Sequence, residues 1–349
     1  MGSGDRLRIL AVTNMYPNPS RPTSGVFVEQ QVSGLRKIGV EVDVLFVDRE
    51  KIGMRAYANL AGRIRSHLAT FDADVVHAMY GGVMADVTTR AVRDRPTVVT
   101  FHGSDLLGEN LSGLRRKWIA KYGVSRSRQA ALRASGIVVV AKHLMNQLPA
   151  RVNRSDVRLI PCGIDLTRFR PLNPQTCRAR LGWPEGRFHV LFNAGNPVKR
   201  PALARAAVEA LTRMGVPAEM HELRGVSNDE VSLWLNGSDA LLLTSLHEGS
   251  PTIVKEALAC NLPVVSVDVG DVAERIAQIE GCYLAAATAQ DLAAKLRLVR
   301  EAEDRIEAHS TMGQLSVERI AMRLRQFYGE ILSAREPQTR KFGHGVVPR

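Results

Sequence analysis

The feature that most constrains the fold of this chain is a repeated alternation of short apolar runs with segments of helical length. The runs are RLRILAVT, VEVDVLFV, ADVVHAM, PTVVTFHG, GIVVVA and VRLIPCG in the first half, and RFHVLFNAG, AEMHELRG, DALLLTS and LPVVSVDV in the second. Strands that alternate with helices in this way form parallel sheets, because each helix carries the chain back to the same edge. The pattern therefore predicts an α/β protein.

The length of the chain predicts two domains. At 349 residues it exceeds what one hydrophobic core usually fills, and 45% hydrophobic residues with both signs of charge indicate a folded, soluble protein. The strand pattern pauses at 166–185, a linker rich in Pro and Arg without strong periodicity. We therefore predict two Rossmann-like, doubly wound domains, residues 1–165 and 186–313, that face a central crevice.

The C-terminal segment reads as one helix followed by a tail. Residues 314–334 are predicted to be helical, and the tail 335–349 has little to bury and is predicted to be mobile. The apolar positions at helical spacing are Val317, Ile320, Leu324, Phe327 and Ile331.

Two carboxylates bracket a turn in HEGSPTIVKEALACNLPVVSVDVGDVAE, residues 247–274. Glu248 precedes the turn Gly249-Ser250-Pro251, which opens a helix whose free N–H groups favour an anion. Glu256 lies one helical turn further on, so both acids face the same crevice. Because carboxylates repel phosphate, we expect them to accept hydrogen bonds from hydroxyls that flank a diphosphate. A nucleotide sugar has hydroxyls on both sides of its diphosphate.

This E-x7-E arrangement resembles the donor-site motif of the retaining glycosyltransferases of family 4, the group 1 glycosyltransferases, which have the two-domain GT-B architecture. The resemblance runs from about residue 8 to residue 330. It implies that residues 1–165 bind the acceptor and that residues 186–313 bind the nucleotide sugar. It also implies that Glu248 binds the donor sugar, that Glu256 binds the ribose hydroxyls, and that residues 314–334 cross back onto the first domain. It also implies that the sugar and diphosphate contact the segment formed by Gly249, Ser250, Pro251, Thr252 and Ile253.

Two further motifs follow strands of the first half. Gly25 precedes the helix VFVEQQVSGLRKIG, where a glycine lets a backbone amide approach a ligand and the helix start favours negative charge. His102 belongs to HGSD, which follows PTVVTF and therefore lies at the carboxyl edge of the sheet. By the resemblance, Gly25 faces the donor diphosphate and His102 lies near the donor sugar. Asp105 orients the loop or caps a helix.

Two cations precede the first helix of the second half. Lys199 and Arg200 stand in a turn where the helix dipole also favours anions. The resembled family has Gly-Arg, a short spacer and Lys here, whereas this sequence has Asn196 in place of the Arg. We expect Lys199 to contact the diphosphate. Arg200 is the second candidate, and whether it replaces the missing guanidinium stays open.

The sequence DAD at 72–74 matches the DxD metal motif of the other major glycosyltransferase fold. Asp74 immediately precedes the strand VVHAM, however, so it lies at the amino end, away from the crevice. No His/Cys/Asp cluster with metal-ligand spacing appears elsewhere in the sequence. We therefore predict a site without a metal or another cofactor, in which cations and helix ends stabilise the leaving group.

A basic block occupies residues 110–155, which contain ten bases and no acid and account for most of the net charge of +12. Its first part is amphipathic and includes Trp118 and Tyr122. Such a block is typical of a solvated helix face, an anionic membrane contact or a site for a phosphorylated acceptor. The pI of about 10.0 adds nucleic acid as a weaker alternative, without a recognisable reading module. We expect the block to recruit an anionic partner.

The cysteines and the apolar runs predict the compartment. Cys162, Cys177, Cys260 and Cys282 form no CxxC pair, which favours reduced thiols in the cytoplasm. No apolar run approaches the roughly 18–20 residues that span a bilayer. We therefore predict a cytoplasmic protein, with peripheral contact at the inner membrane face as an extension of that prediction.

Together these features predict a retaining, metal-independent glycosyltransferase with His102, Lys199 and Glu248 as catalytic residues. It would move a hexose or N-acetylhexosamine from a nucleoside diphosphate, favoured to be UDP, to an acceptor hydroxyl. GDP or ADP donors are the alternatives. A cell-surface polymer, a lipid-linked glycan and a natural product all stay open as acceptors. A nucleotide-sugar- or nucleic-acid-binding protein without transferase activity is the alternative from another class.

Overall fold

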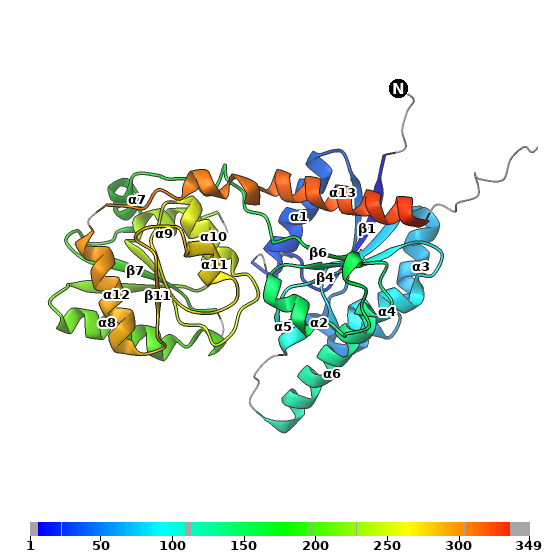
Figure 1. Cartoon of the computed structure of the whole chain (residues 1–349), viewed down its shortest axis with the longest axis horizontal. Coiled ribbons are helices and arrows are strands. Elements are labelled where there is room, and N and C mark those ends of the chain that lie inside the picture. The colour runs from blue at the N-terminus through cyan, green and yellow to red at the C-terminus, as the bar shows by residue number, and fades with distance from the viewer. Residues whose placement is uncertain are drawn as a thin grey trace, which may run out of the picture.

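The computed structural model describes residues 6–335, apart from 22, 109–112, 196, 228 and 303, and apart from the side chains of 50, 52, 115 and 116. Two parallel sheets, each with helices on both faces, lie next to each other along the long axis of the molecule (Figure 1). This arrangement confirms the predicted fold class. The predicted tail and Asn196 lie outside the described residues.

The first sheet has six parallel strands in the order β2-β1-β3-β4-β5-β6. The strands are β1 (Arg8–Thr13), β2 (Glu41–Phe46), β3 (Val75–Ala78), β4 (Thr97–Phe101), β5 (Gly136–Val139) and β6 (Val157–Leu159). The helices around it are α1 (Val26–Lys37), α2 (Arg49–Ile52), α3 (Leu60–Thr70), α4 (Gly82–Ala91), α5 (Ser104–Leu107) and α6 (Leu114–Ala131). Short 3-10 turns lie at η1 (Gly53–Tyr57), η2 (Lys142–Gln147) and η3 (Arg154–Asp156).

The second sheet has five parallel strands in the order β11-β10-β9-β7-β8. The strands are β7 (Phe188–Asn193), β8 (Ala218–Leu223), β9 (Ala240–Leu243), β10 (Val264–Val267) and β11 (Tyr283–Ala285). The helices are α7 (Pro174–Leu181), α8 (Pro201–Arg213), α9 (Val231–Gly237), α10 (Thr252–Ala259), α11 (Val272–Ile276) and α12 (Ala289–Glu301), with 3-10 turns η4 (Pro197–Lys199) and η5 (His309–Leu315).

The central strands are buried on both faces, which explains their sequences. All residues of β4, β5, β9 and β10 are buried. A strand covered by helices on both sides gains from an apolar side chain at every position, so it reads as a continuous Val/Ile/Leu run rather than an alternation. These runs therefore fix where the carboxyl ends of the two sheets, and hence the crevice, lie.

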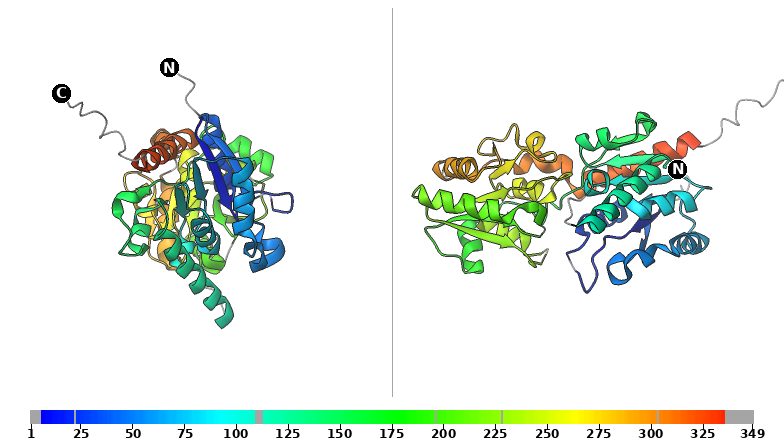
Figure 2. Two further views of the ribbon diagram at one scale, coloured as in Figure 1. Left: turned by 90° about the vertical axis from the view of Figure 1, so that its right-hand side faces the viewer. Right: turned by 90° about the horizontal axis from the view of Figure 1, so that it is seen from below.

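The C-terminal helix α13 (Val317–Arg335) joins the two domains a second time. Its start pairs with the segment after β6, because Ile164 N donates to Leu315 O at 2.9 Å and Val317 N donates to Ile164 O at 3.0 Å. The helix then runs over the first domain (Figures 1 and 2), where Leu324 joins the core around Ile9. None of the helices in the described part of the chain combines the length and apolar character needed to cross a bilayer.

Two elements differ from the sequence expectation. The segment predicted as a linker without periodicity contains helix α7, which begins after the Asn173 cap, whose side chain accepts from Thr176 N at 2.8 Å. Only Cys177 of α7 is buried, so the helix lacks the apolar stripe that a periodicity argument requires. The short edge strand β11 was also missed, because three residues are too few for an alternation to register.

Candidate functional site

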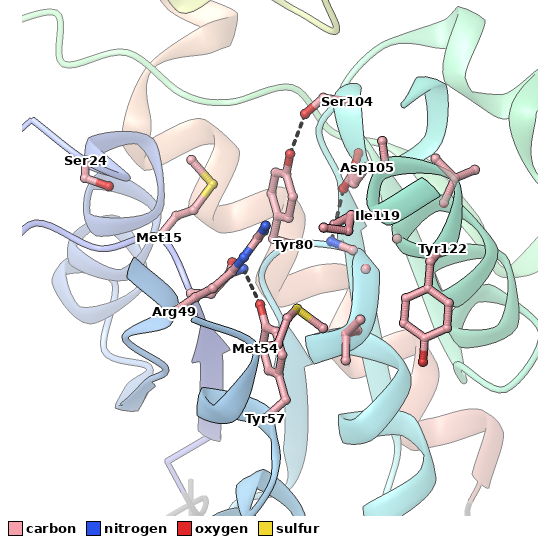
Figure 3. Close-up of a pocket in the computed structure, with 17 residues that line it drawn as sticks. Met15, Ser24, Arg49, Met54, Tyr57, Tyr80, Ser104, Asp105, Ile119 and Tyr122 are labelled. Atoms are coloured by element: carbon pink, nitrogen blue, oxygen red, sulfur yellow. Dashed lines mark hydrogen bonds between the residues drawn. The ribbon is translucent and has the colours of Figure 1, made fainter. Parts of the chain in front are cut away.

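Three pockets lie near the carboxyl ends of the sheets, two of them lined by both domains and the third by the first domain alone. The Glu256 pocket, about 560 Å³, is lined by residues including Gly25, Asn193, Arg224 and Glu256. The His102 pocket, about 250 Å³, is lined by residues including Phe27, Tyr80, His102, Lys199 and Glu248. The Tyr57 pocket, about 490 Å³ and drawn in Figure 3, is lined by residues including Asn14, Arg49, Tyr57 and Tyr80. Met15 lines all three, so the three pockets lie around one side chain.

Gly25 allows the loop after β1 to reach these pockets. Its φ of 68° lies in the left-handed region, and it is the N-cap of α1. An added Cβ would overlap the carbonyl of Met15 and lie 2.5 Å from Tyr16 N. Only glycine lets the loop fold against itself here, which sets Met15 and the start of α1 at the edge of the pockets.

Glu248 and Lys199 form an ion pair in the His102 pocket. Lys199 Nζ contacts Glu248 Oε1, which also accepts from Ser245 Oγ at 2.8 Å. The side chains are only 18% and 15% exposed, so water screens the pair less than it would at a free surface. The structure thus brings together a cation from η4 and a carboxylate from the loop after β9.

The Arg200 side chain contacts backbone carbonyls after β9 instead of the pocket. Its Nε donates to Thr244 O and one of its terminal nitrogens lies 3.4 Å from Ser245 O. Its backbone, at φ 54°, is the N-cap of α8 in the left-handed region, which a non-glycine residue rarely adopts. The guanidinium therefore fastens η4 to the end of β9, and Lys199, rather than Arg200, lines the pocket.

Helix α10 carries the second carboxylate to the Glu256 pocket. The helix starts at Thr252 after the Pro251 cap, and Thr252 and Ile253 line both the Glu256 and the His102 pockets. Burial raises the pKa of the Glu256 carboxyl to about 7. A carboxylate that loses hydration gains from ligand hydroxyl groups that replace it.

His102 is held as a neutral ring. Its Nε2 donates to Met79 O at 3.0 Å, so Nδ1 carries the lone pair and faces Cys162 Sγ at 3.6 Å. Burial lowers the pKa of His102 to about 4. The ring lies between Phe27 and Tyr80, with centroids at 4.6 and 5.6 Å. This arrangement suits a rigid wall of the pocket better than a proton carrier.

Asp105 orients the loop that carries His102. Its carboxylate accepts from the backbone N–H groups of His102 at 3.0 Å, Gly103 at 2.8 Å and Gly81 at 3.0 Å. Burial raises the pKa of Asp105 to about 6, while these amides act in the opposite direction. Of the two roles weighed from the sequence, this contact pattern matches the loop-orienting one.

The two domains touch at a pair of glycines. An added Cβ on Gly103 would lie 2.9 Å from Gly249 N, and one on Gly249 would overlap the carbonyl oxygen of His102. Backbone meets backbone here without room for any side chain. The turn after Glu248 is thereby set directly against the His102 loop.

Lys255 is a residue that sequence reasoning missed. It is fully buried on α10 and reaches the segment after β6 of the first domain, where its Nζ donates to Cys162 O at 3.0 Å. Its Nζ also lies 3.2 Å from Ser250 Oγ, which donates to Asp271 Oδ2 at 2.8 Å. Ser250 therefore uses its hydroxyl within the second domain. No sequence signal separates this buried lysine from an exposed one on a helix.

The DAD sequence lies outside these pockets, as expected. Asp74 precedes β3, and its carboxylate accepts from Arg8 N at 2.7 Å. Asp72 forms an ion pair with Arg95 at 2.8 Å. Both acids therefore fasten the amino ends of strands.

Family models match both halves of the chain. The model described as Glycosyltransferase Family 4 matches residues 51–168, and the one described as Glycosyl transferases group 1 matches residues 184–301. The chain belongs to the group 1 glycosyltransferases. The glycosyltransferase is 26% identical to the teichuronic acid biosynthesis glycosyltransferase TuaC of Bacillus subtilis, over 82% of this chain and 87% of TuaC. It is 30% identical to a D-inositol 3-phosphate glycosyltransferase of an Arthrobacter species, over 39% of each chain.

Solved structures show that the glycosyltransferase has the GT-B fold. Sucrose-phosphate synthase from Thermosynechococcus elongatus superposes with a TM-score of 0.76 at 16% identity, covering 94% of this chain and all of that one. HepE from Anabaena, in complex with UDP, superposes with a TM-score of 0.69 at 16% identity, covering 93% and 100%.

Proposed function

We propose that this enzyme transfers a hexose or N-acetylhexosamine from a UDP-sugar to an acceptor hydroxyl, with retention of configuration and without a metal ion. The observation that carries the proposal is a pair of adjoining pockets that share Thr252 and Ile253: one contains Glu256, and the other contains His102 and the Lys199–Glu248 ion pair. HepE, of the same fold, binds UDP, and a starch synthase of the same fold binds ADP, so we take UDP as the first donor to test, with ADP and GDP beside it. Retention rests on family membership alone.

We expect different residues to bind the ribose, the diphosphate and the sugar of the donor. Glu256 would accept from the ribose hydroxyls in its pocket, and Glu248 from hydroxyls of the sugar. Lys199 would meet the diphosphate and stabilise the charge that grows on it as the sugar leaves. Gly25 and Gly249 let backbone approach the diphosphate. His102 would support the sugar as a neutral wall. A binding protein without activity would use Lys199 only to hold the diphosphate, so loss of Lys199 would change its affinity and no turnover.

The Tyr57 pocket is the candidate acceptor site. It adjoins the His102 pocket through Tyr80, whose hydroxyl lies 2.6 Å from Ser104 Oγ (Figure 3). Asn14 Nδ2 donates to Tyr57 OH at 3.0 Å, while Asn14 Oδ1 is buried without a partner among the described residues. An unpaired acceptor beside aromatic rings suits a ligand hydroxyl. Arg49 adds a cation for an acidic group, in keeping with the teichuronic acid name of TuaC.

A donor screen tests the proposal. UDP-sugars should raise the melting temperature more than GDP- or ADP-sugars, because specific binding stabilises only the folded state. With the donor known, NMR of the product should show the anomeric configuration retained, and added chelator should leave turnover unchanged. A GDP- or ADP-sugar preference would change the donor, and an inverted product would remove the retaining mechanism. Chelator inhibition at a temperature where the chelator-treated enzyme stays folded would restore a catalytic metal.

Donor binding should weaken below neutral pH through Glu256. Its pKa of about 7 in the free enzyme must fall when ribose hydroxyls donate to the carboxylate, so binding releases a proton at lower pH. We expect about a tenfold higher dissociation constant for the UDP-sugar at pH 6 than at pH 8. Calorimetry in two buffers of different ionisation enthalpy measures both the dissociation constant and the number of protons released on binding.

The variant Glu256→Gln is the control for this pH dependence. It should bind more weakly at pH 8, because a charged acceptor in a hydrogen bond is worth about 1.5 to 3 kcal/mol. It should also lose the dependence on pH between 6 and 8. A Gln variant with the slope of the unchanged enzyme would assign the titration to another group.

We further propose that helix α6 binds an anionic membrane surface. The helix projects from the first domain in two views (Figures 1 and 2). Leu114 and Trp118 are 79% and 72% exposed, and Ile119 and Tyr122 of the same helix line the Tyr57 pocket. Exposed apolar side chains beside cations favour a bilayer over a purely solvated face or a phosphorylated acceptor.

Part of the basic block has a structural role instead. Arg126 and Arg133 lie 3.6 and 2.8 Å from the fully buried carboxylate of Asp86. In contrast, Lys117 and Lys121 form no ion pair with any residue that the structure describes, and Lys117 is exposed on α6. We therefore restrict the predicted anion-binding surface to the part of α6 that carries Lys117 and Lys121.

The double variant Leu114→Ser/Trp118→Ser should reduce binding to vesicles containing anionic phospholipid at least tenfold. Burying each of the two apolar side chains in the bilayer contributes about 1.5–3 kcal/mol to binding, and the variant loses both contributions. Donor affinity should stay unchanged. Met214→Ser/Leu298→Ser, exposed on the second domain, is the matched control. Vesicle co-sedimentation measures the loss, and rising salt should weaken binding because charge is screened over about 8 Å. Equal sedimentation of both variants would mean that α6 is a solvated face.

A further inference from the structure

A second group of ionisable side chains lies away from the crevice. Among the described residues, His189 on β7 and Glu219 and His221 on β8 place their ligand atoms within 4.8 Å of one another. The parallel register pairs His189 with Glu219 and Leu191 with His221. Because side chains alternate along a strand, all three residues share one face of the sheet. Sequence spacing hides the group, since its members come from two strands about 30 residues apart.

The hydrogen bonds of the two imidazoles fix their tautomers. His189 Nε2 donates to Pro184 O at 3.0 Å, so its Nδ1 carries a lone pair. His221 Nε2 lies 2.9 Å from that Nδ1 and must donate to it. A lone pair on Nδ1 requires the His189 ring to be neutral, and it points at His221 Nε2. Neutral imidazole is the form that binds metal ions.

We propose that His189, Glu219 and His221 bind a divalent transition-metal ion, with Zn²⁺ as the favoured ion. Two histidines and a carboxylate are a common ligand set for such ions. Nitrogens 2.9 Å apart could both lie about 2.0–2.1 Å from one ion at an angle near 90°. A tetrahedral angle needs them only about half an ångström further apart.

The surroundings match those of a metal site. The bond from His189 to Pro184 O is the outer-shell contact that orients a ligating imidazole. Trp183 stacks on His221 at 3.6 Å and 7°, and Trp234 meets Trp183 edge-on, so the rings are held in place. The Glu219 side chain is 40% exposed on the edge strand and lies 4.0 Å from Arg187 Nε, a contact that a metal ion would replace.

The ion would be structural rather than catalytic. His189 is the second residue of β7, whereas Asn193, at the carboxyl end of the same strand, lines the His102 pocket. Four residues of strand separate the two by about 13 Å. An ion here would join the edge strand β8 to β7 and stabilise the second domain. The transfer reaction would remain metal-independent, so this proposal stands or falls separately from the proposed function.

Titration of untagged, chelator-treated protein tests the site. We expect one equivalent of Zn²⁺ to bind, seen by calorimetry, and the melting temperature to rise. Co²⁺ should give a visible absorption band. Glu219→Gln should weaken Zn²⁺ binding by about 10–100-fold or more, since even loss of an outer-shell partner costs that much. Glu222→Gln, on the opposite face of β8 where Glu222 pairs with Arg205, is the matched control and should bind like the unchanged protein.

Nitrogen NMR reports the tautomer of His221, which a change in protein stability alone would not alter. Zn²⁺ should shift His221 from the Nε2–H to the Nδ1–H tautomer, because the metal replaces the proton that His221 shares with His189. No stoichiometric binding, equal affinity in Glu219→Gln and Glu222→Gln, or an unchanged His221 tautomer would each overturn the proposal. The two rings would then be a hydrogen-bonded pair in an aromatic cluster.

Discussion

Replacing Lys199 with alanine should lower kcat about 10²–10³-fold while leaving the dissociation constant for UDP within a few-fold of its original value. The ammonium contacts Glu248 in the pocket that His102 also lines. A charge in this position stabilises the departing diphosphate more than the bound donor, because negative charge grows as the sugar leaves. Steady-state kinetics and calorimetry with UDP separate the two effects.

Two variants make the Lys199 result interpretable. Lys142→Ala removes an exposed lysine of the first domain and should change neither quantity. Lys199→Ala/Glu248→Ala should be less damaging than the sum of its single changes, because each single change leaves the other charge unpaired. A kcat that survives loss of Lys199 would transfer the leaving-group role to Arg200, despite its bonds to the backbone after β9.

The fold and the local motifs could be predicted because their causes are local. A strand buried on both faces must be apolar throughout, so β4, β5, β9 and β10 are visible in the sequence. Glu248 and Glu256 are separated by a turn and one helical turn, and that spacing alone sets them at one sheet edge. The helix α7 was missed because it is held by a cap and one buried cysteine rather than by an apolar stripe.

The rest of the site depends on contacts between distant segments. Met15 joins three pockets only because Gly25 folds its loop back, and Lys255 reaches Cys162 O from the other domain. The basic block looks uniform in sequence, yet Asp86, far outside the block, binds two of its arginines. Such pairings need the tertiary structure, since no periodicity within one segment encodes them.

The Glu256 and Lys199 roles both require the two domains to meet correctly, and one glycine controls that meeting. An added Cβ at Gly249 would overlap the His102 carbonyl oxygen and lie 2.8 Å from its carbon and 3.3 Å from Gly103 Cα. All three atoms belong to the backbone, so no side chain can move aside. The turn that carries Glu248 and the loop that carries His102 would have to separate.

Gly249→Ala should therefore lower kcat/KM at least about 100-fold, the usual result of moving reacting groups by about 1 Å. The melting temperature should change little, because the contact joins two domains that each keep their own core. Gly329→Ala is the matched control: its Cβ meets nothing within 4 Å on α13, and it should stabilise that helix by about 1 kcal/mol. Small-angle scattering should show Gly249→Ala more open than the unchanged enzyme. A Gly249→Ala enzyme with full activity would mean that the domains need not touch at this point during transfer.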